Sequence, residues 1–180
     1  MNVDYNITIY ENTTDNKARF TLGTAGRNPM ITIGLNPSYA DNIRSDRTIT
    51  KVMGYCQRAT QSFDSFIMLN LYPQRAPDPS EIHATPNPKL KNNNIEVIVG
   101  ILAAIESPSI LAAWGETIFV RPFLIESLEE IYHATIDFKI NWLKIGELTQ
   151  SGHPRHPSRA SYLPLTTFNI NKYIQTLKSH

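Results

Sequence analysis

Four short apolar runs, each followed at once by polar residues or glycine, constrain the fold of this chain more than any other feature. The runs and the residues after them read MITIG-LNPSYAD, SFIML-NLYPQRA, SILAA-WGE and NWLKI-GELTQSGHPRHPS. Runs that are apolar throughout are typical of parallel strands covered on both faces. The carboxyl ends of neighbouring parallel strands meet at one edge of a sheet, where open α/β folds bind ligands. The four endings therefore predict a single binding site.

Helical segments alternate with these runs along the chain. We expect helices over residues 46–60, 88–106, 119–133 and 168–178, and a long proline-rich loop over residues 72–88. Strands that alternate with helices form right-handed crossovers, which place helices on both faces of the sheet. The pattern predicts an α/β fold, a three-layer α/β/α sandwich whose central sheet is mainly parallel and has about four strands.

The amino-terminal part of the chain has a different pattern. Residues 5–10 and 17–22 are rich in β-forming residues and flank the turn-prone segment ENTTDN, so we expect a β-hairpin that extends the sheet at one edge. A length of 180 residues is enough for one substantial core. We therefore interpret residues 1–180 as a single domain.

Composition limits the classes of function. The 17 Lys and Arg residues nearly balance the 16 Asp and Glu residues, so any contact with nucleic acid must come from a local patch. The one cysteine, Cys56, has no partner for an internal disulfide, and residues 1–10 lack the pattern of a signal peptide. The longest apolar stretch, residues 95–105, is far shorter than the roughly 20 residues of a membrane span. We expect a cytoplasmic protein without a membrane segment, and its oligomeric state stays open.

The endings of the four runs carry a resemblance to known families. GLNPS at 34–38, MLN at 68–70, AAWG at 112–115 and HPS at 156–158 resemble, in order and spacing, the motifs of the uracil-DNA glycosylase superfamily. LNPSYAD, NLYPQRA, AWG and GHPRHP look more closely like the uncharacterised bacterial and phage family known as domain of unknown function 1643, over nearly the whole chain. This closer family has no settled activity to carry over. The resemblance implies a uracil-DNA glycosylase-like fold with a nucleobase pocket.

The resemblance also implies roles for three residues. Asn36 matches the position that holds the attacking water, Asn70 matches the base-reading asparagine, and His156 matches the histidine that stabilises charge on the leaving base. A neutral His156 that donates to a base oxygen would act like an oxyanion-hole group, which contributes about 2.7 to 4 kcal/mol. The amide of Asn36 would orient water rather than deprotonate it. We therefore name Asn36 and His156 as the candidate catalytic residues.

Further residues are candidates for contact with a nucleobase-containing ligand. The amide of Asn70 offers one acceptor and two donors to a base edge, and the arginines of the histidine loop suit phosphate. The expected contacts are Ser38, Tyr39, Asn70, Trp114, Gly115, Arg155, Ser158 and Arg159. Each has a structural alternative: the asparagines can simply support turns, the tryptophan can be core, and the histidine loop can be exposed.

Two departures from the glycosylase pattern weaken the DNA-repair interpretation. Arg159 and Ala160 occupy the place where glycosylases commonly carry a leucine wedge, and Tyr39 lies one residue later than the tyrosine that excludes thymine. Without a wedge, a free nucleotide or a single strand is favoured over duplex DNA. The leading hypothesis is that the protein recognises a nucleobase or nucleotide, and the reaction to be considered is hydrolysis of its N-glycosidic bond.

Two alternatives stay open. The first is a non-catalytic nucleotide-binding or interaction module of the same fold. The second is a different hydrolase or transferase that uses Asp41, Asp46 and His156, with Arg75 and His153 completing an alternative polar site. His153 and His156 are three residues apart, but no cysteine cluster or HExxH pattern accompanies them, so we expect no metal and no cofactor.

Overall fold

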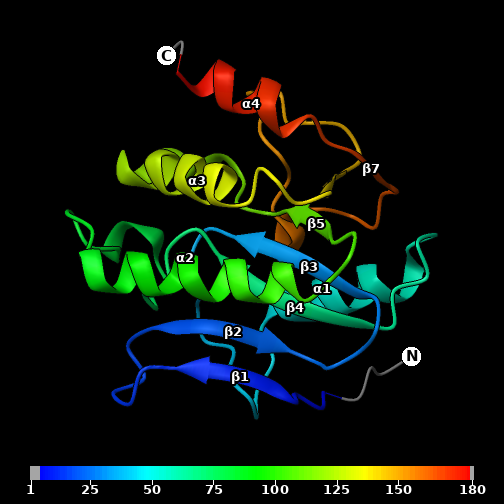
Figure 1. Ribbon diagram of the computed structural model, residues 1–180, viewed down its shortest axis with the longest axis horizontal. Coiled ribbons are helices and arrows are strands. Elements are labelled where there is room, and N and C mark those ends of the chain that lie inside the picture. The colour runs from blue at the N-terminus through cyan, green and yellow to red at the C-terminus, as the bar shows by residue number, and fades with distance from the viewer. Residues whose placement is uncertain (1–4, 179–180) are drawn as a thin grey trace.

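The chain folds around one sheet that helices cover on both faces (Figure 1). The computed structural model describes residues 5–178, which contain seven strands and four α-helices. In their order across the sheet the strands are β1 (Ile9–Asn12), β2 (Arg19–Gly23), β4 (Ser65–Asn70), β3 (Pro29–Gly34), β5 (Ser109–Ala112), β6 (Asn141–Ile145) and β7 (Leu165–Thr167). The helices are α1 (Arg47–Arg58), α2 (Pro88–Ala103), α3 (Phe123–Ala134) and α4 (Ile170–Leu177).

The direction of the strands creates a switch point between β3 and β5. Strand β3 pairs in parallel with both β4 and β5, and β5 pairs in parallel with β6. The chain leaves β3 for β4 on one side and later crosses to β5 on the other side. Ligands of open α/β sheets bind outside the carboxyl ends of the strands at such a point. The topology thus selects the ends of β3 and β5 as the place for a site.

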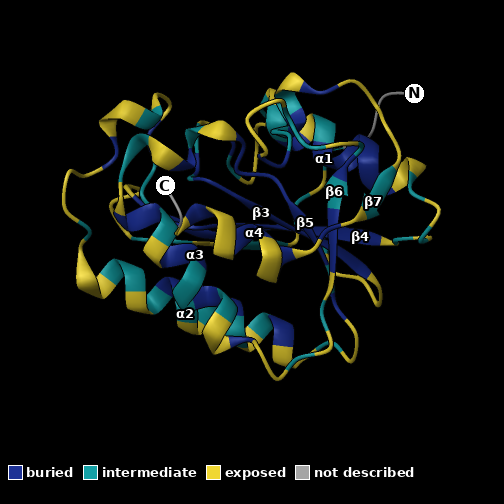
Figure 2. Cartoon of the chain, turned by 90° about the horizontal axis from the view of Figure 1, so that it is seen from above, coloured by how far each residue is buried: buried dark blue, intermediate teal, exposed yellow. Residues whose placement is uncertain are grey.

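Alternate residues of the central strands serve the two faces of the sheet. Ile31 and Ile33 belong to the core that includes the buried residues of α2, α3 and α4, whereas Met30 belongs to the core that includes the buried residues of α1. Figure 2 shows α1 on one side of the sheet and α2 and α3 on the other. Because both faces are covered, strands such as β3 are buried along their whole length, which explains their continuous apolar sequence.

Helix α1 agrees with the face predicted from its sequence. Asp46 caps its amino end by accepting a hydrogen bond from the Ile49 backbone nitrogen at 2.9 Å. Ile49, Val52, Met53 and Cys56 are buried. Burial raises the pKa of the Cys56 thiol to about 11, so this cysteine is a protonated core residue at neutral pH.

The mixed α/β fold is confirmed, but the sheet is wider than expected. Strand β7 was not predicted, because it has only three residues, none of them buried, and it pairs with β6 at the edge of the sheet. The helix expected from residue 119 begins only at Phe123, after a 3₁₀ turn, Glu116–Val120. Pro122 precedes this helix, and proline is compatible with a helix start but not with a helix interior.

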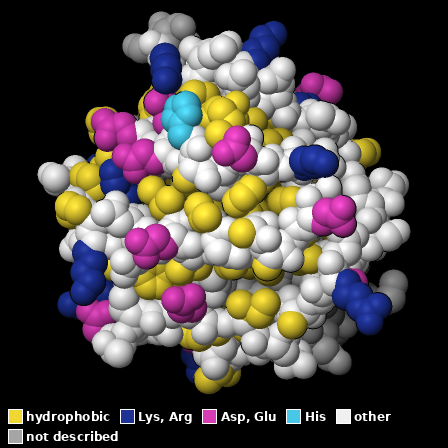
Figure 3. Space-filling view, viewed as in Figure 1, with side chains coloured by type: hydrophobic (Ala, Val, Ile, Leu, Met, Phe, Trp, Pro, Cys, Tyr) yellow, Lys and Arg dark blue, Asp and Glu magenta, His cyan; other side chains and the backbone are white. Residues whose placement is uncertain are grey.

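Charged side chains do not gather by sign on the face formed by α2 and α3. Figure 3 shows acidic and basic side chains interspersed there with apolar ones. Within residues 5–178 no helix combines the length and the apolar character needed to cross a membrane.

Two glycines provide a matched test of the packing between β2 and β4. A Cβ added to Gly23 would lie 2.2 Å from the Phe66 carbonyl oxygen, whereas a Cβ added to Gly100 in α2 would meet no atom within 4 Å. We expect Gly23→Ala to lower the free energy of unfolding by about 1 to 3 kcal/mol, because the backbone of β4 must shift. Gly100→Ala should raise it by about 0.5 to 1 kcal/mol through helix propensity. Urea denaturation measures both, and equal effects of the two variants would contradict the β2–β4 packing.

Candidate functional site

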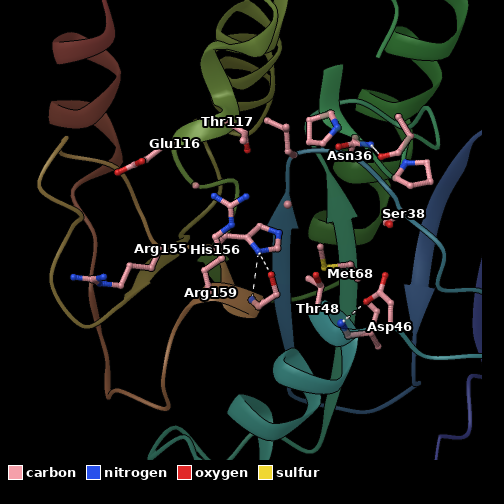
Figure 4. Close-up of a pocket in the computed structure, with 18 of the residues that line it drawn as sticks. Asn36, Ser38, Asp46, Thr48, Met68, Glu116, Thr117, Arg155, His156 and Arg159 are labelled. Carbon is pink, nitrogen blue, oxygen red and sulfur yellow. Dashed lines mark hydrogen bonds between the residues drawn. The ribbon is translucent and has the colours of Figure 1, made fainter. Parts of the chain in front are cut away.

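A cavity of about 380 Å³ opens at the carboxyl ends of β3 and β5, at the switch point of the sheet. Its wall comes from the start of β2, the end of β3, Met68 of β4, the start of α1, and the loops that follow β3, β4, β5 and β6 (Figure 4). The residues that line it and carry polar side chains are Arg19, Asn36, Ser38, Asp46, Thr48, Glu116, Thr117, Thr149, Arg155, His156, Ser158 and Arg159. The cavity is therefore predominantly a polar site built from segments far apart in sequence.

Gly115 allows the histidine loop to close onto the end of β5. Its φ of 69° lies in the left-handed region that side chains other than glycine rarely adopt. A Cβ at this position would lie 3.2 Å from the Cβ of His156. Glycine is thus required both by the turn and by the close approach of His156.

The hydrogen bonds of His156 determine where its ring proton lies. Nδ1 lies 3.3 Å from the Ser158 backbone nitrogen and 2.8 Å from Ser158 Oγ. A backbone N–H can only donate, so Nδ1 is the acceptor and the proton belongs on Nε2. The other ring nitrogen, Nε2, faces the cavity in Figure 4. His156 therefore presents a hydrogen-bond donor to a ligand.

His156 is also kept neutral. Burial, followed by the positive charge of Arg159, lowers the pKa of His156 to about 4, although Asp46 acts in the opposite direction. At neutral pH His156 is therefore already a neutral imidazole, and its Nε2–H can stabilise negative charge on a ligand oxygen.

Of the two aspartates named in the alternative site, only Asp46 lines the cavity. Its Oδ1 caps α1, while Oδ2 accepts a longer bond of 3.4 Å from the Ala40 backbone nitrogen. Asp41 instead accepts the backbone N–H groups of Ile43 and Arg44 at 2.8 and 2.7 Å, and these bonds lower the pKa of its carboxyl group. Asp41 thus organises a turn outside the cavity.

Glu116 adds a second carboxylate to the wall, which the sequence had not suggested. Hydrogen bonds from the side chains of Thr149 and Ser151 lower its pKa. Two acidic side chains thus line the cavity, Asp46 at the start of α1 and Glu116 after β5.

Asn36 lines the cavity, but its amide nitrogen is occupied. Nδ2 donates to the carbonyl oxygens of Ala76 at 2.8 Å and Pro37 at 3.0 Å, which ties the loop after β3 to the loop after β4. Within residues 5–178, its Oδ1 has no hydrogen-bond partner and is left to accept from water or a ligand.

Asn70 does not line the cavity, contrary to the expectation of a base-reading contact. Its side chain is completely buried. With the amide oriented so that its nitrogen donates, it bonds to the carbonyl oxygens of Leu69 at 3.2 Å and Asn36 at 3.3 Å. Asn70 thus has the structural role that the sequence left open as an alternative: it supports the end of its strand through bonds to the backbone.

Trp114 and His153 belong to the core beneath the loops. Trp114 is inaccessible to solvent, and its Nε1 donates to Tyr173 Oη at 3.1 Å. The same hydroxyl lies 2.9 Å from His153 Nδ1. These contacts hold the histidine loop against α4, and neither residue lines the cavity.

Of the remaining candidates, some line the cavity and others lie outside it. Tyr39 is 73% exposed and lies outside the cavity, and Arg75 bonds to the carbonyl oxygens of Ser38 and Ala40 rather than to the cavity. Ser38 and Ser158 line it. Arg155 and Arg159 also line it, with Arg155 Nε donating to the Glu147 carbonyl oxygen at 2.9 Å.

Sequence reasoning missed Arg19, the first residue of β2. Its side chain lines the cavity although the residue is only 2% exposed, and one terminal nitrogen donates to the Ala40 carbonyl oxygen at 2.8 Å. Burial, and then the charge of Arg75, lowers its pKa to about 10, so it stays charged at neutral pH. The only signal in the sequence was a basic residue inside a strand that is otherwise buried.

No group of three or more His, Cys, Asp and Glu side chains is arranged to hold a metal ion within residues 5–178.

Comparison with known proteins identifies a family but no activity. Residues 19–158 match the model of the family described as Protein of unknown function (DUF1643). The matched range runs from Arg19 to Ser158, so it includes nearly the whole cavity wall. Neither the curated proteins nor the solved structures give a significant match.

The depressed pKa of His156 predicts a loss of stability in acid. Its folded-state pKa of about 4 lies below the ordinary value of 6.5, so the unfolded chain binds this proton first as the pH falls. Between these two values the folded state should lose up to about 1.4 kcal/mol per pH unit. His156→Gln should remove this part of the pH dependence, and Ser158→Ala, which keeps the histidine, should retain it. Urea denaturation at several pH values measures the slope, and an unchanged slope in His156→Gln would refute the assignment.

Proposed function

We propose, for a chain that belongs to the DUF1643 family, that the cavity at the ends of β3 and β5 binds a nucleotide, either free or within a single strand of nucleic acid. The observation that carries the proposal is the neutral His156, whose Nε2–H faces a polar cavity. A volume of about 380 Å³ lies at the lower end of the range for small-molecule sites.

The wall offers complementary groups for the parts of a nucleotide. His156 donates to a carbonyl oxygen of the base, and the hydroxyls of Thr48 and Thr117 can donate or accept. The carboxylate of Asp46 accepts from amino or sugar hydroxyl groups. This mixture suits an uncharged base and sugar better than an apolar ligand.

The resemblance to the uracil-DNA glycosylase superfamily supports the same proposal. Residues from GLNPS and HPS, which lie at opposite ends of the chain, meet at this one cavity. We therefore also propose a uracil-DNA glycosylase-like fold. The two intermediate motifs contribute less, since only Met68 and Gly115 of them line the wall.

Hydrolysis of the N-glycosidic bond is the second candidate, and the position of Asp46 favours it. Asp46 and His156 lie on opposite sides of the cavity in Figure 4. Water held by Asn36 Oδ1 would attack the sugar carbon and pass a proton to Asp46, while the bond to the base breaks and its electrons move onto the base. His156 Nε2–H would stabilise the resulting charge. Asp46 would be the proton acceptor and Asn36 would orient the water, because a carboxylate is a far stronger base than an amide.

Binding is tested with a panel of nucleosides and 5′-mononucleotides measured by calorimetry. His156→Ala should weaken binding of bases that carry a carbonyl oxygen by about tenfold, the effect of losing a hydrogen bond in a buried site. His133→Ala, at an exposed position on α3, is the matched control and should bind like the wild type. Equal affinities of wild type and His156→Ala would remove the histidine from recognition, and no binding by any compound would refute the nucleotide proposal.

Hydrolysis is tested with the same mononucleotides and with single-stranded and duplex oligonucleotides containing uracil, hypoxanthine or a mismatch. Release of free base and alkali-labile sites are the products to detect. Asp46→Asn should lower the rate by about 10²-fold or more, since general base catalysis contributes about that much, while Asn still caps the helix. Asp41→Asn, outside the cavity, is the control. If no substrate yields free base, the hydrolytic candidate is excluded and binding stands alone.

A further inference from the structure

We propose that Arg19 forms an anion subsite in the wall of the cavity and binds the phosphate group of the ligand. The identity of that ligand as a nucleotide rests on the proposed function, but the subsite itself follows from the surroundings of Arg19. The loop arginines Arg155 and Arg159, which the sequence suggested for phosphate and which also line the cavity, would then have a secondary role.

The guanidinium of Arg19 has donors without acceptors. One terminal nitrogen donates to the Ala40 carbonyl oxygen at 2.8 Å, whereas Nε is buried without a partner. No carboxylate forms an ion pair with Arg19 among residues 5–178. A guanidinium has five N–H groups, so most of its hydrogen-bonding capacity is unused. A buried charge without a counterion is costly, and a bound anion would remove that cost.

A second guanidinium adds to the positive charge at this place. Arg75 donates to the same Ala40 carbonyl oxygen at 3.0 Å and to Tyr10 Oη at 2.7 Å. Two arginines thus converge on one neutral oxygen, and their mutual repulsion helps to lower the pKa of Arg19. Since Arg75 does not line the cavity, Arg19 is the member of the pair that a ligand can reach.

Asp46 limits the charge that the subsite accepts. Its carboxylate attracts Arg19 but forms no ion pair with it, and it caps α1 on the cavity wall. The combination of Arg19 with a nearby carboxylate favours a phosphate group with a single negative charge and a neighbouring hydroxyl that can donate to Asp46. A phosphodiester has this charge, and so does a protonated mononucleotide phosphate.

Arg19 is better placed than the loop arginines for tight binding. Arg159 is exposed, and Arg155 already donates through Nε to the Glu147 carbonyl oxygen. Salt screens exposed charges strongly and buried charges weakly. The contribution of Arg19 should therefore persist when the salt concentration rises, unlike that of Arg159.

The experiment compares the affinity of a nucleoside with that of its 5′-monophosphate by calorimetry, with inorganic phosphate as a separate probe. In the wild type the monophosphate should bind about tenfold or more tightly than the nucleoside, as expected for a charge-assisted contact. Arg19→Gln should bring this ratio close to one and abolish phosphate binding, with the nucleoside affinity unchanged. Arg159→Gln, in the loop after β6, should lower the ratio by no more than about twofold at physiological salt. Arg27→Gln, at an exposed position outside the cavity, is the control and should leave the ratio unchanged.

A second variant covers the case in which Arg19→Gln does not fold, as judged by circular dichroism. Arg19→Lys keeps the charge and a donor to Ala40 but loses the planar fork, so its ratio should fall by about fivefold relative to wild type. An unchanged ratio in the folded variant would overturn the proposal, as would a ratio that depends on Arg159 alone. A dinucleotide without terminal phosphate distinguishes a phosphodiester of a nucleic-acid strand from the phosphate of a free nucleotide. If its binding depends on Arg19, the subsite is assigned to a nucleic-acid strand. If it does not, the subsite is assigned to free nucleotides.

The two proposals fail in different ways. Arg19-dependent binding of inorganic phosphate, without binding of any nucleoside, would leave the subsite intact and refute base recognition. Nucleoside binding that depends on His156, with a monophosphate ratio near one in the wild type, would refute the subsite and leave base recognition intact.

Discussion

The parallel pairing of β3 with β4 on one side and β5 on the other determines where this protein can hold a ligand. Gly34 pairs with Asn70 and Ile33 with Ala112, so the three strands end at nearly the same level. Because α1, which follows β3, and α3, which follows β5, pack on opposite faces, the loops after β3 and β5 diverge and leave a cavity between them. The positive φ of Gly115 then allows His156 to close one side of that cavity.

Burial has different consequences for the pKa values of His156 and Arg19, which both line this cavity. It lowers the pKa of His156 to about 4 and that of Arg19 to about 10. At neutral pH the histidine is therefore an uncharged donor, whereas the arginine keeps its charge, since its ordinary pKa is far higher. The same cavity thus offers a neutral donor for a carbonyl oxygen and a buried positive group for an anion. A nucleotide carries both chemical features.

Much of the fold and part of the site could be predicted from local patterns. The apolar runs identified β3 to β6, and the helical periodicity identified the buried face of α1. Asn36, Gly115 and His156, which follow strands along the chain, line the cavity. Asn70 also lies at the end of a strand, yet its side chain turns into the protein and bonds to backbone oxygens. The direction of a side chain at a strand end depends on its neighbours in space, which the local pattern does not contain.

The sequence by itself determined strands β1 to β6, the approximate extent of the helices, and the clustering of the polar strand endings at one edge, because periodicity and turn residues act over a few neighbouring positions. Only the tertiary structure decided that Arg19 and Asp46 face the same cavity as His156, while Asp41, Trp114 and His153 do not. Arg19 arrives there because β2 pairs antiparallel with β4 at the edge of the parallel strands. The choice of partner strand and register depends on contacts between distant segments, and these form only when the whole core packs.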